Sequence, residues 1–141
     1  MIAEARQVFR YITGKNSSRI IRIQNQSGGH LVPYDQNLTE RIRFALQVHP
    51  GFVEKKMFGG VGFMLGGNMV CGVQGDDMIV RVGEENNEAA LSQPFVRQFT
   101  VMQGKPMAGW IVVAPDGTAT DQELREWIEK GYTYTSALPE K

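Results

Sequence analysis

Apolar residues first recur at helical spacing in residues 35–51. One face of the helix predicted there carries Leu38, Ile42, Ala45, Leu46 and His49. Asn37 is its predicted N-cap, because Glu40 follows three residues later in a variant of the capping box. The pair Pro50 and Gly51 predicts where the helix ends.

The period then changes to two residues, which is typical of strands. Residues 53–58 alternate, and three further segments each place an apolar set on one face: Val61, Phe63 and Leu65; Met69, Cys71 and Val73; Met78, Val80 and Val82. Glycine, asparagine and aspartate separate these segments, at residues 59–60, 66–68 and 75–77. Glycine and asparagine tolerate the positive φ of tight turns, so the pattern predicts a four-stranded antiparallel meander.

The second half of the chain alternates between helical and extended patterns. It predicts a short helix at residues 84–91, a weak strand around 95–102 and a strong strand at 109–114, with turns at 104–106 and 115–117. A capping box of Thr120 and Glu123 opens a last helix with an apolar stripe of Leu124, Trp127 and Ile128. Gly131 is the predicted C-terminal cap of that helix.

The predicted elements run in the order α-β4-α-β2-α. Strands in a block joined by tight turns form an antiparallel sheet, and the helices around the block must cover one of its faces. The sequence therefore predicts an α+β, two-layer sandwich with the helices on one face, formed by residues 32–141.

Residues 1–31 differ in charge from the rest of the chain. They carry five basic side chains and one acid, whereas residues 32–141 carry ten basic and fourteen acidic side chains. We interpret residues 1–31 either as an upstream extension that results from a misplaced translation start or as a disordered N-terminal tail. The alternative is a basic arm that binds nucleic acid or a membrane surface.

The glycine-rich residues 59–67 do not form a nucleotide-binding motif. Gly62 and Gly67 have the spacing of a phosphate loop, but Asn68 and Met69 stand where lysine and a hydroxyl residue are needed. The segment that follows is a predicted strand, so no helix N-terminus faces a phosphate. The sequence predicts no nucleotide site here, and no cofactor.

Candidate metal ligands and nucleophiles are few. The chain has two histidines, His30 and His49, and one cysteine, Cys71, which excludes an intramolecular disulfide and fits a reducing compartment. Cys71 stands on an apolar strand face, where cysteine behaves as a small hydrophobe. We therefore expect no catalytic residue and no metal site, and the chain has no apolar run of membrane-helix length.

The predicted strands contain cationic residues and methionines. Lys55 and Lys56 are expected to point to opposite faces, and Arg81 is expected either to be exposed or to pair with Glu54 or an aspartate. Most of the internal methionines fit a core. Met64 is the exception, because it alternates with Phe63 and Leu65 onto the second sheet face. That face is therefore expected to be partly covered, by a partner or by the chain itself.

The motifs "KKMFGGVGFMLGGNMVCGV", "MIVRVG" and "GKPMAGWIVV", the helix around Trp127 and the closing "LPEK" resemble the N-terminal domain of the TfoX/Sxy family. The resemblance covers residues 34–141. It implies a two-layer α+β fold and a bacterial cytoplasmic protein. The matching motif positions are Lys56, Met57, Phe58, Gly59, Gly60, Arg81, Gly83, Lys105, Pro106, Met107, Gly109 and Trp110.

Full-length members of the family regulate natural competence, are thought to act with the cyclic-AMP receptor protein, and carry a second, C-terminal domain. The resemblance and the lack of a catalytic constellation lead to the first hypothesis, a non-enzymatic regulatory module that binds a protein partner such as a transcription regulator. Its predicted binding residues are Lys56, Met57, Phe58, Gly59, Gly60, Met64, Arg81, Lys105, Met107 and Trp110.

The second hypothesis is a domain that binds a small anionic ligand, or an enzyme, in which Lys56, Arg81, Lys105 and Trp110 converge on a pocket. Direct nucleic-acid binding is not expected, because residues 32–141 are net acidic and lack interleaved stacking aromatics. A DNA-binding accessory is the third hypothesis, and the salt dependence of binding would distinguish it from the other two.

Overall fold

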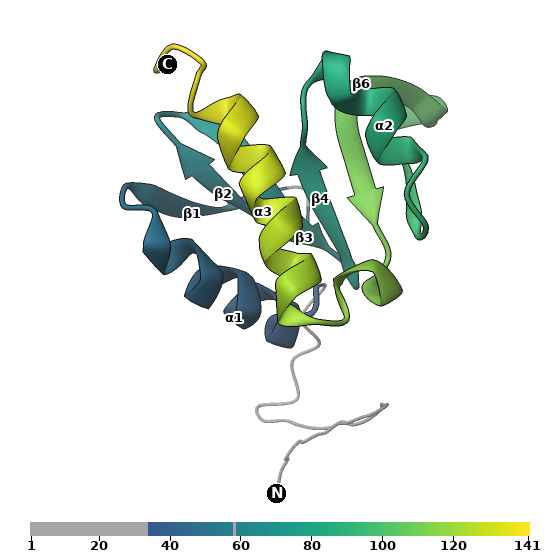
Figure 1. The fold of residues 1–141 in the computed structure, drawn as a ribbon. Coiled ribbons are helices and arrows are strands. Elements are labelled where there is room, and N and C mark those ends of the chain that lie inside the picture. Colours follow the sequence, from purple (N-terminus) through teal and green to yellow (C-terminus); the bar gives the residue numbers. More distant parts are fainter. Residues whose placement is uncertain (1–33, 58) are drawn as a thin grey trace, which may run out of the picture. The chain divides into compact units, whose positions relative to one another are not determined.

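The computed structural model describes residues 34–57 and 59–141 (Figure 1). The predicted extension, residues 1–31, and Phe58 lie outside the described residues. In chain order the helices and strands are α1 (Gln36–Ala45), β1 (Phe52–Met57), β2 (Gly60–Leu65), β3 (Asn68–Gln74), β4 (Asp77–Arg81), α2 (Asn87–Leu91), β5 (Val96–Val101), β6 (Lys105–Val113) and α3 (Asp121–Thr135). Short 3-10 turns are η2 (Leu46–Val48), η3 (Glu84–Asn86), η4 (Met102–Gly104) and η5 (Pro115–Thr118).

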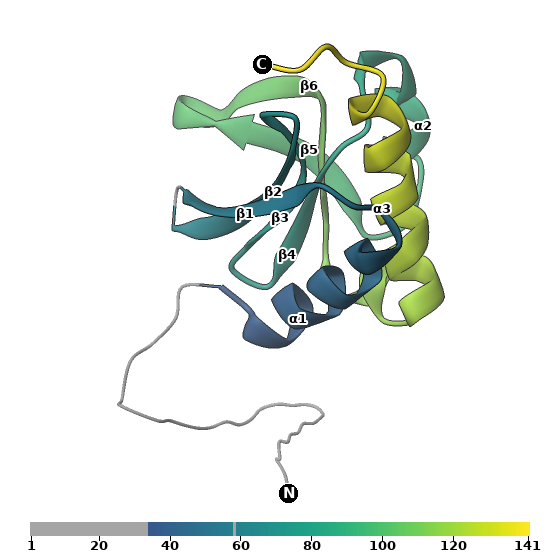
Figure 2. The same ribbon diagram turned by 90° about the vertical axis from the view of Figure 1, so that its left-hand side faces the viewer.

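The six strands form one antiparallel sheet in the order β1-β2-β3-β4-β6-β5. The first four strands are the predicted meander, and β6 joins it beside β4. The three labelled helices lie on one side of the sheet, and the β1–β2 and β5–β6 hairpins extend toward the other side (Figure 2). The predicted two-layer α+β fold is confirmed, with the sheet open on the side away from the helices.

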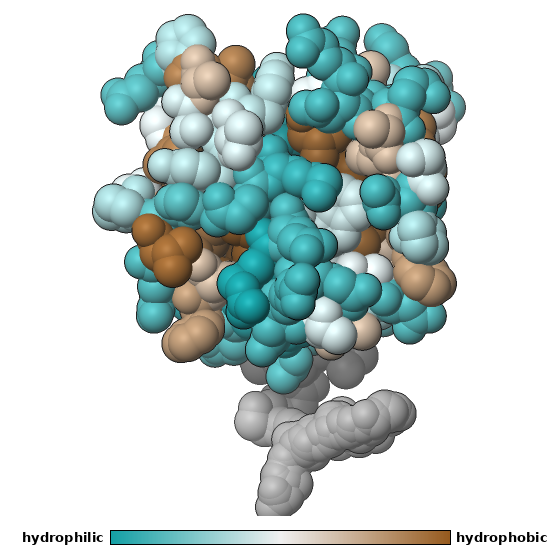
Figure 3. All heavy atoms as spheres, viewed as in Figure 1, coloured by the Kyte–Doolittle hydropathy of each residue, from teal (hydrophilic) through white to brown (hydrophobic). Residues whose placement is uncertain are grey.

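The core lies between the sheet and the helices. Ile42 of α1, Leu124 and Ile128 of α3, and Val80 and Ile111 of the sheet are almost completely buried there. On the helical side, a hydrophilic band runs along α3 with hydrophobic residues on both sides of it (Figure 3). None of the helices in the described part of the chain is long and apolar enough to cross a membrane.

The helices begin and end partly where the sequence predicts. Helix α3 opens with the predicted capping box, in which Thr120 and Glu123 each bond to the backbone N–H of the other. Helix α1 begins two residues earlier than predicted, because Asp35 caps it by accepting a hydrogen bond from Leu38 N at 3.1 Å. The prediction of Asn37 as N-cap was therefore wrong.

The prediction of Gly131 as a C-terminal cap was also wrong, because α3 continues to Thr135. Gly131 lies inside the helix, against β3. A Cβ atom on Gly131 would lie 2.8 Å from the carbonyl oxygen of Val70 and 3.1 Å from Val70 Cγ1. The missing side chain is what allows α3 to approach the sheet this closely, so the glycine serves packing instead of helix termination.

Strand β3 contains a bulge that the period-two pattern did not predict. The register of β2 and β3 pairs Phe63 with Cys71 but Met64 with Met69, which leaves Val70 as the extra residue. Cross-strand partners share a face, so Cys71 faces the core with Phe63, whereas Met69 faces the open side with Met64. The expectation that Met69, Cys71 and Val73 share one face was therefore wrong for Met69.

Replacing Gly131 with alanine should lower the free energy of unfolding by about 1–3 kcal/mol, the range for overpacking a close contact. An alanine at an unhindered helical glycine would instead raise it by about 1 kcal/mol. Chemical denaturation of Gly131→Ala and of Thr133→Ala, an exposed position on the same helix, provides the comparison. A Gly131→Ala protein more stable than the wild type would contradict the close packing.

The cap at Asp35 leads to a second prediction, which concerns how stability depends on pH. Burial is the largest influence on this carboxyl group and raises its pKa above 3.8, so the folded state disfavours the ionised form. Asparagine caps as well as aspartate but carries no charge. Asp35→Asn should therefore be more stable than the wild type at neutral pH, and this advantage should disappear as the pH falls toward 3.8.

Asp35→Ala is the matched control, because it removes the cap and the charge together. It should cost about 1 kcal/mol relative to Asp35→Asn. Denaturation curves of the three proteins between neutral and acidic pH provide the test. A difference between wild type and Asp35→Asn that does not change with pH would show that the charge of Asp35 is not penalised by folding.

Candidate functional site

The open side of the sheet carries a groove of about 600 Å³, which falls within the usual range of ligand-binding clefts. None of its lining residues belongs to α1, α2 or α3. We call it the sheet-face groove, and it is lined by Met57, Gly60, Val61, Met64, Gly67, Met69, Val73, Gln74, Ile79, Arg81, Phe99, Thr100, Val101, Met107, Trp110 and Lys141.

Two glycines make room for methionine side chains in this groove. Gly62 of β2 and Gly72 of β3 are direct cross-strand partners. A Cβ atom on Gly62 would lie 3.4 Å from the sulfur atoms of both Met57 and Met69. One on Gly72 would lie 2.6 Å from Met69 Cε. The methionines therefore lie over bare backbone, so the sheet contributes almost no side-chain bulk beneath them.

Four of the methionines with described side chains line the groove: Met57, Met64, Met69 and Met107. Met78 is fully buried in the core. The prediction that most methionines are core residues therefore fails for this group, although it holds for Met78. The reason is the bulge and the paired glycines, which give the second face an apolar surface of its own.

Arg81 lies at the end of β4, opposite Trp110 of β6. Its guanidinium carbon is 5.0 Å from the centre of the Trp110 ring and 5.4 Å from that of the Tyr134 ring. Tyr134 reaches this place from α3 because Gly83 has no side chain. A Cβ atom there would lie 2.4 Å from the tyrosine ring. Two aromatic rings on different layers therefore hold Arg81, at distances that allow cation–π attraction.

Arg81 has no carboxylate partner among the described residues. The predicted alternatives were an exposed position or a pair with Glu54 or an aspartate. Glu54 instead pairs with Arg43 of α1, which lowers the pKa of the Glu54 carboxyl group. Arg81 is half-buried, so its charge is partly removed from water without an acid to balance it.

A partly buried polar network fixes the backbone at Trp110. Gln98 Nε2 donates to the carbonyl oxygens of Met107 at 2.7 Å and Trp110 at 2.8 Å. Asn87 of α2 donates to Gln98 and accepts from Gly109 N at 2.8 Å. Gly109 has a φ of 91°, which favours glycine, and its carbonyl accepts from the N–H groups of Val82 and Gly83. The network thereby ties α2 and β4 to the strand that carries Trp110.

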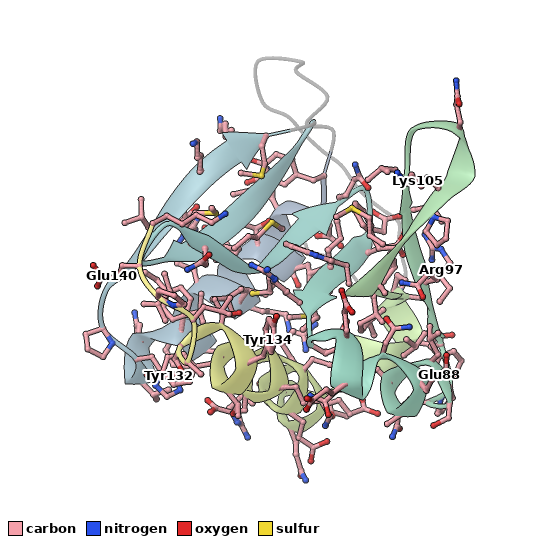
Figure 4. The ribbon with its side chains drawn as sticks, turned by 90° about the horizontal axis from the view of Figure 1, so that it is seen from above. Glu88, Arg97, Lys105, Tyr132, Tyr134 and Glu140 are labelled. Atoms are coloured by element: carbon pink, nitrogen blue, oxygen red, sulfur yellow. The ribbon has the colours of Figure 1, made fainter. Side chains whose placement is uncertain are left out.

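The segment after α3 closes one end of the groove. Lys141 N donates to Gly66 O at 2.9 Å, and Asn68 Nδ2 donates to Pro139 O at 3.1 Å. In the view from above, Glu140 lies on this segment and Tyr134 lies on α3, while Lys105 lies on the distant β5–β6 hairpin (Figure 4). The contacts bring Lys141 into the groove lining beside the β2–β3 turn.

The structure brings six of the ten sequence-predicted binding residues into the groove lining: Met57, Gly60, Met64, Arg81, Met107 and Trp110. Gly59 and Lys105 do not line it, and Phe58 lies outside the described residues. Lys56 is two residues from Glu54, which contacts Arg43 of α1, so Lys56 projects on the helical side. Lys56 therefore does not share a face with Met64 and Arg81.

Sequence reasoning missed Met69, Ile79, Phe99 and Lys141 as groove residues. Ile79 and Arg81 alternate along β4, and this pattern was available as a signal that both face the same side. Met69 gave no such signal, because the bulge reverses its direction. Lys141 depends on contacts between segments far apart in the chain.

The charges around the groove are unbalanced. The lining includes two cations, Arg81 and Lys141, and no acid. In the strand register, Lys55 is the cross-strand partner of Gly62, and Lys105 is the cross-strand partner of the lining residue Val101. Cross-strand partners share a face, so both lysines project on the groove side. Asp77 of β4 also projects on this side but is paired with Arg97 at 3.0 Å. The lining itself therefore carries net positive charge, which favours an anionic occupant.

Other reactive groups in the described residues are committed to packing. Cys71 is fully buried, and desolvation raises the pKa of its thiol to about 12, so the thiol stays protonated at neutral pH. His49 stacks on Tyr132 with ring centres 3.7 Å apart, and its Nε2 lies 2.7 Å from Glu129 Oε2. No cluster of three potential metal ligands occurs within residues 34–57 and 59–141.

The family model of the TfoX N-terminal domain matches residues 45–134. The chain belongs to this family. The resemblance seen in the glycine and methionine motifs is thereby confirmed. Comparisons with curated proteins and with solved structures found no significant match.

Within this TfoX N-terminal domain, the matched residues contain the whole groove lining except Lys141. The motif positions Gly83 and Gly109 acquire physical roles there, because one makes room for Tyr134 and the other allows the kink before Trp110. Both glycines therefore support the position of Arg81 and Trp110 at the groove.

The paired glycines of this TfoX N-terminal domain should differ in their tolerance of a methyl group. On Gly72 it would lie 2.5 Å from the Val61 carbonyl oxygen, whereas on Gly62 it meets only methionine side chains at 3.4 Å. Gly72→Ala should lower the free energy of unfolding by about 1–3 kcal/mol, and Gly62→Ala should change it by less than about 1 kcal/mol. Urea denaturation measures both, and equal effects would contradict the described floor of the groove.

Proposed function

We propose that this TfoX N-terminal domain is a cytoplasmic, non-enzymatic regulatory module that binds a protein partner in the sheet-face groove. The partner contributes a segment with apolar side chains and negative charge. The observation that carries this proposal is the methionine-lined surface on the one sheet face that the helices leave open.

Methionine supports protein binding for a physical reason. Its side chain is unbranched and its sulfur is polarizable, so it adapts to differently shaped apolar groups. Met57, Met64 and Met107 are half-buried, and a bound segment would remove the rest of their apolar surface from water. Burial of apolar surface contributes about 25 cal/mol per Å², which gives the groove a source of affinity.

The charges around the groove favour an acidic partner. Arg81 and Lys141 line it, and Lys55 and Lys105 project on the same side. Complementary charge raises the rate of association and disfavours partners of the wrong sign. This charge complementarity, combined with the methionine lining, supports an acidic and apolar segment as the occupant.

The second hypothesis, a convergent anion or catalytic site, has less support. It required Lys56, Arg81, Lys105 and Trp110 to meet, but only Arg81 and Trp110 do so. Lys56 projects on the helical side, and Lys105 lies out on the β5–β6 hairpin (Figure 4). Membership of the TfoX N-terminal domain family supports the regulatory role that we propose, with a transcription regulator as the partner class.

Groove variants test the proposal against a matched surface control. Met64→Gln combined with Met107→Gln makes two lining positions polar at similar length. The control combines Phe44→Gln with Val48→Gln, which are 73% and 70% exposed and do not line the groove. Affinity capture from a lysate of the source organism, followed by mass spectrometry, compares the wild type with both double variants.

We expect a protein that is captured by the wild type and by the control but lost by the groove variant. A photo-cross-linking amino acid at position 107 should become attached to that protein, whereas one at position 48 should not. Capture that is lost with the Phe44 and Val48 variant and retained by the groove variant would instead place the interface on the helical side and overturn the proposal.

A further inference from the structure

We infer that Arg81 is a carboxylate-binding subsite of the groove, so that the partner segment carries an aspartate or glutamate next to its apolar residues. The inference rests on the proposed function, because the apolar part of the segment must occupy the sheet-face groove. It assigns one residue to one chemical group of the partner.

Arg81 differs from the other arginines of the strands and of α1. Arg41 pairs with Asp121, Arg43 with Glu54 and Glu40, and Arg97 with Asp77. Within the described residues, Arg81 has aromatic partners in place of a carboxylate. Arg125 also lacks one there, but it is exposed on α3 and remains hydrated.

The aromatic contacts leave the hydrogen-bonding edge of the guanidinium available. Trp110 and Tyr134 attract the cation through their rings, and these contacts do not use its N–H groups in conventional hydrogen bonds. A planar guanidinium matches a carboxylate through two parallel hydrogen bonds. The rings also limit the rotamers of Arg81, so less side-chain freedom is lost when a carboxylate binds.

The surroundings of Arg81 strengthen its demand for an anion. The groove lining is mainly apolar, and its other charged residue is the cation Lys141. When a segment covers the groove, water leaves the guanidinium, and an unpaired buried charge is strongly unfavourable. A covering segment that supplies a carboxylate at this point removes that penalty, whereas a purely apolar segment does not.

The position of Arg81 is also defined by elements outside the groove. Gly83 makes room for Tyr134, and Asn87 and Gln98 fix the backbone of Trp110. Both rings therefore have places that do not depend on a ligand. The subsite is set before binding, as expected for a site that selects one chemical group.

A random peptide library displayed on phage tests the inference directly. The selections use the wild-type protein, Arg81→Gln, the Met64→Gln and Met107→Gln double variant, and Arg125→Gln. The last is a matched control, because Arg125 is exposed on α3, does not line the groove and removes the same charge without leaving a partner acid unpaired. Circular dichroism and the unfolding temperature show whether each variant is folded, and Arg81→Lys tests whether charge alone is sufficient.

The wild type and Arg125→Gln should enrich peptides with an acid beside apolar residues, and Arg81→Gln should enrich apolar peptides without the acid. A peptide from the wild-type selection should bind Arg81→Gln about 10- to 100-fold more weakly. Changing its acid to the corresponding amide should weaken binding to the wild type similarly and have little effect on Arg81→Gln. Arg81→Lys should recover only part of the affinity, because it lacks the planar fork.

The outcomes separate this inference from the proposed function. Peptides that need the methionines but carry no acid would overturn the role of Arg81 and leave the groove as the binding site. Selections that do not depend on Met64 and Met107 would overturn both. Decanoate, titrated as a free carboxylate with an apolar chain, provides the last comparison. Binding of decanoate in the absence of any groove-dependent peptide would assign Arg81 to a small molecule and overturn the inference.

Discussion

The contact between Val70 of β3 and Gly131 of α3 determines both layers of this domain. Val70 is the extra residue of the β-bulge, and its side chain packs where Gly131 has none. The close approach brings α3 onto the sheet and buries the core. The same bulge turns Met69 away from Cys71 and onto the open face. One local irregularity therefore allows tight helix packing on one side and supplies a groove residue on the other.

The two faces of the sheet are both apolar, but they differ in how they are covered. The helical face is filled mainly by branched aliphatic residues, which pack in fixed conformations. The open face has methionines over glycine, with Phe99 and Trp110 beside them. The first arrangement suits a permanent interface within the chain, whereas the second suits an exchangeable one. The half-buried guanidinium of Arg81 adds a polar requirement to an otherwise adaptable surface.

The sequence predicted those features that depend on neighbouring residues. The period-two segments and their glycine turns gave the meander, and the Thr120 and Glu123 box gave the start of α3. Gly131 was misread because its role depends on Val70, sixty-one positions earlier in the chain. The glycine and methionine motifs gave much of the groove, but Lys55 and Lys56 alternate, and only the register with β2 shows which of them faces it.

The segment after α3 has a practical consequence for experiments on this protein. Lys141 is held beside the β2–β3 turn by its hydrogen bond to Gly66, and its side chain is part of the groove wall. A purification tag or surface linker attached after Lys141 would begin at the edge of the groove. It would compete with bound molecules for the same space, so a measured affinity would depend on the tag. Attachment through an exposed residue on the outer side of α3 would leave the groove open.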